Sequence, residues 1–171
     1  MVIFAISGSL RETSSNTSIL HTMKSVAPAG HEFIIYDQVG SLPHYNPDLD
    51  LEKVPAEVEE LRGMISRAAV IIISTPEYAH GIPGSLKNAL DWLVSTTLLE
   101  NKPISIIIGS SSDGSYALTA LIEILKTMNA QVIPQLTRQI SGVQANAEDP
   151  QTWQGLRDLA ENLILYSREK S

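Results

Sequence analysis

The sequence predicts an α/β protein of three layers, in which helices cover both faces of a five-stranded parallel sheet. Short apolar runs alternate along the chain with segments whose apolar residues recur at helical spacing. The runs are apolar at consecutive positions, as expected for strands that are buried on both faces. Right-handed crossovers between such strands favour the strand order 2-1-3-4-5.

The first half of the chain contains two predicted strands and one long loop. A strand at Val2–Ile6 precedes a helix from about Asn16 to Val26, and a second strand follows at Glu32–Tyr36. Residues Asp37 to Pro55 are polar and rich in proline. A loop of this length is unusual in a compact domain, so it indicates a function or an interface.

The alternation continues to the end of the chain. The segment 134–151 shows no clear periodicity and is expected to be a polar connection. The other elements are expected as a helix with Pro55 as its first residue, a strand at Ala69–Ser74, a helix from Ser85 to about Leu99, a strand at Pro103–Ile108, a helix that carries Leu118, Leu121, Ile122 and Leu125, a short strand at Gln131–Ile133 and a last helix near Thr152–Ser167.

Composition limits the possible functions. The 171 residues are 43% hydrophobic and 18% charged, which fits one globular domain over residues 1–171. Because the chain has no cysteine, disulfides, thiolate catalysis and cysteine-bound metals are excluded. The net charge of −7 argues against a nucleic-acid partner, which needs a basic surface.

No membrane or metal function is expected. No apolar run approaches the ~20 residues of a membrane span, and the strand at the N-terminus has no basic segment before it, so a cytoplasmic protein without a signal peptide is expected. The histidines His21, His31, His44 and His80 lack metal-ligand spacing, and no Ser-His-Asp arrangement is evident. We therefore expect neither a metal site nor a catalytic side chain.

The loop Ser7–Thr17 is the densest polar feature of the sequence. It lies between the first strand and the N-terminus of the first helix, where free N–H groups and the helix dipole favour an anion. Its donors are the hydroxyls of Ser9, Thr13, Ser14, Ser15 and Thr17, the amide of Asn16 and the guanidinium of Arg11. This set favours a phosphate site over an ordinary capped turn, although it has neither the lysine of a nucleotide triphosphate loop nor the paired glycines of a dinucleotide site.

Two further loops are expected at the same edge of the sheet. In Thr75–Gly84, Pro76 and Pro83 stiffen the backbone, which can then hold its N–H and C=O groups against a flat heterocycle. Tyr78 either packs on a ring or fills a gap, whereas Glu77 and His80 are more often solvated, capping or surface residues than catalytic ones. The loop Gly109–Ser115 follows the next strand.

These residues resemble a known family. The pattern Gly8-Ser9-Leu10-Arg11-x-x-Ser14-x-Asn16 precedes Thr75-Pro76-Glu77-Tyr78 and the run from Ile82 to Trp92. Together they are similar to the motifs of the NAD(P)H-dependent FMN reductases, a flavodoxin-like family that includes quinone, azo-dye and chromate reductases. The resemblance covers roughly residues 1–130 in layout.

The resemblance implies a set of FMN-binding residues. Ser9, Arg11, Ser14 and Asn16, together with Ser15 and Thr17, would hold the phosphate. Pro76, Glu77 and Tyr78 would lie along the isoalloxazine, and the third loop, with Ser110 and Ser111, would close its other side. The family often has asparagine after the glutamate and tyrosine, where this chain has Ala79.

The implied activity is hydride transfer from NADPH or NADH, by way of bound FMN, to a small acceptor such as a quinone, an azo compound, a metal oxyanion or free flavin. The alternative is an FMN-binding electron carrier or regulatory flavoprotein that does not oxidise NAD(P)H itself. The family also implies a homodimer or homotetramer. We expect Trp92 and the stretch Leu42–Pro47 at that interface, because neither has an obvious place in a core.

Overall fold

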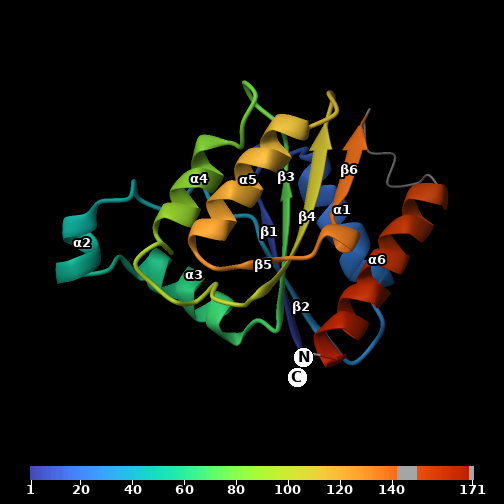
Figure 1. The fold of residues 1–171 in the computed structure, drawn as a ribbon, viewed down its shortest axis with the longest axis horizontal. Helices are drawn as coiled ribbons and strands as arrows, with labels where there is room; N and C mark the ends of the chain where they lie inside the picture. Colours follow the sequence, from blue (N-terminus) through green and yellow to red (C-terminus); the bar gives the residue numbers. More distant parts are fainter. Residues whose placement is uncertain (142–149, 170–171) are drawn as a thin grey trace.

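The computed structural model describes residues 1–141 and 150–169. Figure 1 shows a central sheet with helices on both of its faces. In chain order the elements are β1 (Val2–Ser7), α1 (Ser15–Val26), β2 (Glu32–Tyr36), α2 (Pro47–Glu52), α3 (Ala56–Arg67), β3 (Val70–Thr75), α4 (Gly84–Asp91), β4 (Pro103–Ser110), α5 (Ser115–Thr127), β5 (Gln131–Val132), the 3₁₀ helix η1 (Pro134–Leu136), β6 (Arg138–Ser141) and α6 (Pro150–Glu169).

The sheet has the predicted topology and one additional strand. Its strands pair in parallel in the order β2-β1-β3-β4-β5, which confirms the expected order. The additional strand, β6, pairs with Ile107–Ser110 of β4, whereas β5 pairs with Pro103 and Ile104. The expectation of an irregular connection over 134–151 was therefore wrong at η1 and β6; residues 142–149 lie outside the described part.

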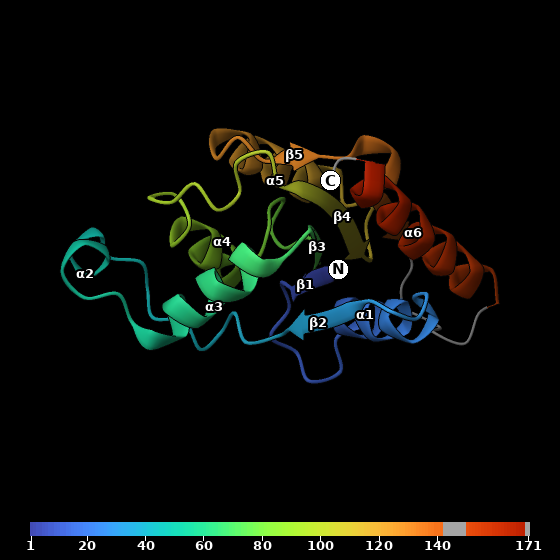
Figure 2. The same cartoon turned by 90° about the horizontal axis from the view of Figure 1, so that it is seen from below.

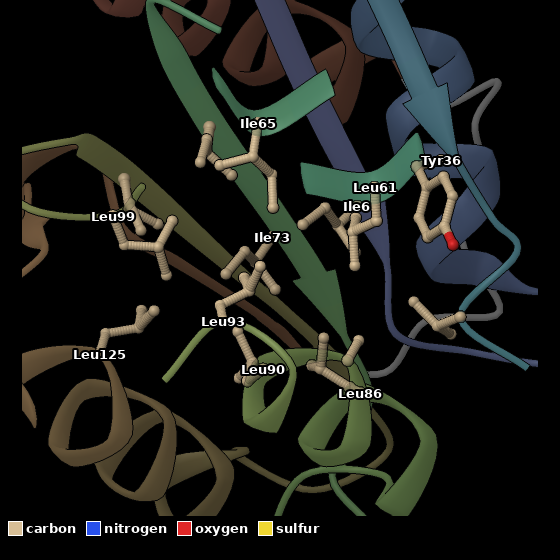
Figure 3. Packing of buried hydrophobic residues seen from close by; sticks show 14 of the residues in the cluster. Ile6, Tyr36, Leu61, Ile65, Ile73, Leu86, Leu90, Leu93, Leu99 and Leu125 are labelled. Atoms are coloured by element: carbon tan, nitrogen blue, oxygen red, sulfur yellow. The ribbon is translucent and has the colours of Figure 1, made fainter. Parts of the chain in front are cut away.

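Alternation along the strands divides the core into two clusters. Phe4 and Ile6 of β1 and Ile71 and Ile73 of β3 face one side, where α3, α4 and α5 pack (Figure 3). Ile3, Ala5, Val70 and Ile72 face the other side, where α1 and α6 pack. Because successive residues of a strand point to opposite faces, strands that are apolar at every position hold a helical layer on each face.

Three helices differ from the prediction. α4 ends at Asp91 instead of near Leu99. The next residue is Trp92, whose backbone carbonyl accepts a hydrogen bond from Arg62 Nε at 3.1 Å. Pro55 is the N-cap of α3, not its first residue. Within the loop expected from Asp37 to Pro55, the chain forms α2, whose first residue is Pro47 and whose N-cap is Asn46.

The expectation that Trp92 has no place in the core and lies at a subunit interface was wrong. Trp92 is fully buried, its indole Nε1 donates a hydrogen bond to the Pro43 carbonyl at 2.8 Å, and its ring meets Tyr45 edge-on at 5.1 Å between centroids. Asn88 Nδ2 donates to the same carbonyl at 3.0 Å. The proline-rich stretch thus packs on α4 of its own chain, and it leads to α2, which projects from the body of the molecule (Figures 1 and 2).

The described part of the chain has neither a membrane-spanning helix nor a cluster of metal-binding side chains. None of the described helices combines the length and hydropathy needed to cross a bilayer. Over residues 1–141 and 150–169, no three histidine, aspartate or glutamate side chains are grouped so that they would hold a metal ion.

Candidate active site

A cleft lies at the carboxyl edge of the sheet, where the loops after β1, β3 and β4 meet. The loops after β3 and β4 both reach the upper end of the molecule in Figure 1. The cleft has a volume of about 150 Å³. Its lining consists of Ser9, Arg11, Ser14, Ser15, Asn16, Pro76, Glu77, Tyr78, Gly109, Ser110 and Ser111.

The first loop is held against the end of β3. The Gly8 amide donates a hydrogen bond to the Ser74 carbonyl at 2.8 Å. A Cβ atom at Gly8 would lie 2.5 Å from Thr75 Oγ1, so only glycine allows the loop to pass this close. The loop then leads to Ser14, whose hydroxyl caps α1 by accepting a hydrogen bond from the Thr17 amide at 3.3 Å.

Four polar side chains of this loop line the cleft. Ser9 and Ser14 are buried in its wall, and Arg11 is exposed at its rim. Ser15 completes the set as the first residue of α1. Hydroxyl donors, a guanidinium and the amino end of a 12-residue helix therefore converge on one space.

Asn16 uses its side chain to join three elements. Its Nδ2 donates to the Gly109 carbonyl at 3.0 Å, and its Oδ1 accepts from the Gly109 amide at 3.1 Å and from Ser74 Oγ at 3.0 Å. A Cβ atom at residue 109 would lie 2.6 Å from that Oδ1. Asn16 thus lines the cleft while it joins α1 to the ends of β3 and β4.

Thr17 lies outside the lining of the cleft. Its Oγ1 is 2.7 Å from Ser7 Oγ, a hydrogen bond that joins α1 to the end of β1. Among the residues that the sequence predicted for FMN binding, the structure gathers all except Thr17 around this one cleft.

The carboxylate of Glu77 holds the second loop to the third. Its Oε1 accepts a hydrogen bond from Ser112 Oγ at 2.9 Å, and its Oε2 accepts one from the Ala117 amide at 2.9 Å. The N-cap of α5 is Gly114, which has no side chain to cap the helix, so Glu77 serves that end of α5. The sequence analysis named capping among the expected roles of Glu77, but not the helix that it caps, because Ser112 and Ala117 lie far from Glu77 along the chain.

The third loop brings Ser110 and Ser111 to the cleft and turns Asp113 toward α5. Ser110 Oγ lies 3.0 Å from Ser112 Oγ. Asp113 Oδ1 accepts hydrogen bonds from the Ser115 amide at 3.1 Å and from Ser115 Oγ at 3.0 Å, which lower the pKa of its carboxyl below the ordinary value. Asp113 is not part of the cleft lining, so its charge is used at the start of α5.

The donors in the lining fit the phosphate of FMN. A phosphate needs several donors and positive potential, and Ser9, Ser14, Ser15 and Arg11 at the start of α1 supply both. The same lining contains Pro76 and the half-exposed ring of Tyr78, which suit a flat heterocycle. The cleft thus offers both kinds of surface that FMN needs.

Comparison with known proteins agrees with this chemistry. The model of the family described as NADPH-dependent FMN reductase matches residues 1–144. The chain is 35% identical over 155 residues to a quinone reductase of Escherichia coli. The match covers 88% of this chain and 82% of the relative. It is 40% identical over 90 residues to a 2-hydroxy-1,4-benzoquinone reductase of a Burkholderia species, with 53% and 48% of the two chains covered.

A solved structure shares the whole fold. The flavoenzyme FerB of Paracoccus denitrificans, an NAD(P)H:acceptor oxidoreductase, superposes with a TM-score of 0.86 at 24% sequence identity. The match covers 98% of this chain and 97% of FerB.

Proposed function

The chain belongs to the NADPH-dependent FMN reductase family, and from this premise we propose that it reduces quinones with electrons from NADPH or NADH. Family membership makes it an NAD(P)H-dependent oxidoreductase with FMN as its cofactor. The quinone is the acceptor that its relatives from Escherichia coli and Burkholderia have in their names.

We assign the FMN phosphate to Ser9, Arg11, Ser14 and Ser15, and the ring to the edge formed by Pro76, Tyr78 and the Ser110–Ser111 backbone. The observation that carries this assignment is the single cleft in which a hydroxyl-rich helix N-terminus and an aromatic edge come together. In our proposal Asn16, Thr17 and Glu77 hold the three loops in register.

Bound FMN supplies the two-electron chemistry, and the chain supplies position and electrostatics. Arg11 and the α1 N-terminus would neutralise the phosphate, and Pro76, Tyr78 and Ser110–Ser111 would lie along the ring. Overall, NADPH, one proton and a quinone give NADP⁺ and a hydroquinone, so no catalytic acid beyond solvent is required.

Absorption spectroscopy tests this function. Protein purified with FMN should show the flavin bands and lose them on anaerobic addition of NADPH or NADH, and 1,4-benzoquinone should restore them with one equivalent of hydroquinone formed. A protein that binds FMN but is not reduced by either nucleotide would instead be an electron carrier. Quinone turnover without flavin bands would overturn the cofactor assignment.

We also propose that residues 1–171 act as one domain that associates as a homodimer. The support for association is α2, which projects from the body and exposes Leu51 at 87% and Leu49 at 40%. In light scattering the parent should show twice its 18.6 kDa chain mass. Leu51→Glu should halve the mass, whereas Leu165→Glu, at an exposed position of α6, should not; a monomeric parent contradicts the proposal.

The cytoplasm is the compartment we propose, because the enzyme draws its electrons from reduced nicotinamide nucleotides. Cell fractionation with an antibody to the chain tests it: recovery of the chain mainly outside the cytoplasmic fraction would contradict the proposal.

A further inference from the structure

Three side chains form a hydrogen-bonded chain that begins in the wall of the cleft. Ser110 is buried in the lining of the cleft, and its Oγ lies 3.0 Å from Ser112 Oγ. Ser112 Oγ in turn donates a hydrogen bond to Glu77 Oε1 at 2.9 Å. Ser112 itself is not part of the lining. It therefore links a hydroxyl at the ligand space to a carboxylate on the neighbouring loop.

The carboxylate fixes the direction of the hydrogen bonds in this chain. An ionised carboxylate has acceptor sites only, and a hydroxyl has a single hydrogen to donate. Because the hydrogen of the Ser112 hydroxyl is donated to Glu77, the hydrogen between the two serine oxygens must come from Ser110. Ser110 is thus a donor toward Ser112 and has no hydrogen left for a ligand in the cleft.

Ser110 retains one acceptor site. A hydroxyl oxygen has two lone pairs, and one of those on Ser110 accepts the Ser112 amide at 3.3 Å. The other has no partner among the described residues, and the side chain that carries it lines the cleft. On Ser112, by contrast, both lone pairs are used, because its oxygen accepts from Ser110 and from the Gly114 amide at 3.4 Å. The chain therefore offers the ligand an acceptor.

The hairpin Pro76–Gly81 holds the carboxylate at the end of this chain. Its turn is closed by two backbone hydrogen bonds of 2.9 and 3.0 Å, and the two residues of the turn have positive φ of 48° and 59°. This conformation has a cost that neighbouring contacts must offset. The His80 ring stacks on Tyr116 with centroids 4.1 Å apart, and Glu77 Oε2 accepts the Ala117 amide. Both contacts fix the hairpin, and Glu77 with it, to the start of α5.

We propose that Glu77 is a positioning residue that makes Ser110 a hydrogen-bond acceptor toward the flavin, and that the group selected by Ser110 is the N3–H of the ring. The proposal rests on the proposed function, since it takes FMN as the ligand of the cleft. N3–H is the single N–H of the oxidised isoalloxazine ring, and the remaining nitrogen and oxygen atoms of the ring offer no hydrogen. An acceptor beside the ring therefore matches the N3 position.

Glu77→Gln tests the direction of the chain. The Ala117 amide requires an acceptor, so the glutamine oxygen faces Ala117 and the glutamine NH₂ group faces Ser112. Ser112 then donates to Ser110, and Ser110 has to present its hydrogen to the ligand. Fluorescence titration with FMN and with N3-methyl-FMN, which lacks the N3 hydrogen, measures the result. We expect the Kd of FMN to rise about fivefold or more and that of N3-methyl-FMN to rise less than about twofold.

Comparison of the two ligands isolates this hydrogen bond. The loss of the Glu77 charge and any shift of the hairpin affect both ligands alike, and the methyl group is present in both proteins. Glu123→Gln removes the same charge from an exposed position on α5 and is the matched control. It should change neither Kd. Equal changes of the two Kd values in Glu77→Gln would overturn the proposal, because the loss would then not depend on the N3 hydrogen.

Two serine variants separate the direction of the chain from a purely structural role. Ser110→Ala removes the acceptor and should raise the Kd of FMN about fivefold, again with little effect on N3-methyl-FMN. Ser112→Ala interrupts the chain but leaves Ser110 able to accept, so the Kd of FMN should stay within about twofold of the parent value. If Ser112→Ala weakens FMN binding as much as Glu77→Gln does, the chain only braces the loops and the proposal is wrong. A parent protein that does not bind FMN would instead contradict the proposed function, so the two failures are distinguishable.

Discussion

The Ser9–Ser15 loop and the Pro76–Gly81 hairpin line the same cleft but are held in place in opposite ways. The loop is positioned by residues that follow it, since Asn16 and Thr17 bond to the ends of β1, β3 and β4. The hairpin is positioned by its own side chains, since Glu77 and His80 contact the start of α5. In the loop the guanidinium of Arg11 lines the ligand space, whereas in the hairpin the carboxylate of Glu77 is the anchor.

This difference teaches that charge alone does not identify a ligand residue. Arg11 and Glu77 both line the cleft, yet two hydrogen bonds engage Glu77 with the third loop and α5. Four substitutions test this division between binding and bracing.

Asn16→Ala should have the largest effect. It leaves the Gly109 amide and carbonyl and the Ser74 hydroxyl without their partner, at a cost of about 3 kcal/mol in the free energy of unfolding. Urea unfolding of the FMN-free protein measures this cost. Asn162→Ala, at an exposed position on α6, is the control. A loss below about 0.5 kcal/mol would show that Asn16 is not a brace.

Arg11→Ala should weaken FMN binding by about 1.5–3 kcal/mol, the value of a charge-assisted hydrogen bond. Stability without FMN should not change, because Arg11 is exposed. Fluorescence titration with FMN and with riboflavin measures the effect. An equal loss for riboflavin would place Arg11 away from the phosphate.

Glu77→Gln should lower the free energy of unfolding by about 1 kcal/mol, because the neutral amide caps α5 less well than the carboxylate does. It should also raise the quinone KM, since the hairpin loses one of its two anchors. Glu123→Gln, on the exposed face of α5, is the control. A variant with the stability and the KM of the parent would show that Glu77 does not anchor the hairpin.

Asp113→Asn should have the smallest effect, and it should depend on pH. The pKa of Asp113 is lowered in the folded protein, so its stabilising contribution is present above the unfolded value near 3.8 and is lost as the pH falls through the folded pKa. Urea unfolding at pH 6 and at pH 3 should show that the parent's advantage over the variant shrinks at the lower pH. The same difference at both values would contradict this account.

Most of the sheet was predictable from the sequence because its strands are apolar at consecutive positions. β6 was missed because Arg138, Gln139 and Ser141 leave Ile140 as its single apolar residue, and only pairing with β4 makes it a strand. α2 was missed although Asn46 and Pro47 give an N-cap and a first residue, because the helix buries none of its residues. The Asp50–Arg62 ion pair that holds it to α3 is not visible in a local pattern.

The candidate site was predictable in composition but not in the roles of its residues. Several hydroxyl residues and an arginine just before a helix indicate an anion site, whatever the order of these residues in the loop. Tertiary partners decide which of these residues hold the loops in place and which line the ligand space. Asn16, for example, bonds to Gly109, which is 93 residues away in the chain. The roles of Glu77 and His80 depend on α5 in the same way.

The central claim is that the Ser9–Ser15 loop holds the FMN phosphate, and the affinity of the parent protein for FMN relative to riboflavin tests it most directly. The two ligands share the ring and the ribityl chain and differ in the phosphate. Calorimetric titration of the flavin-free parent should give a Kd for FMN that is lower by about tenfold or more, equivalent to about 1.4 kcal/mol. Equal dissociation constants for the two ligands would contradict the account.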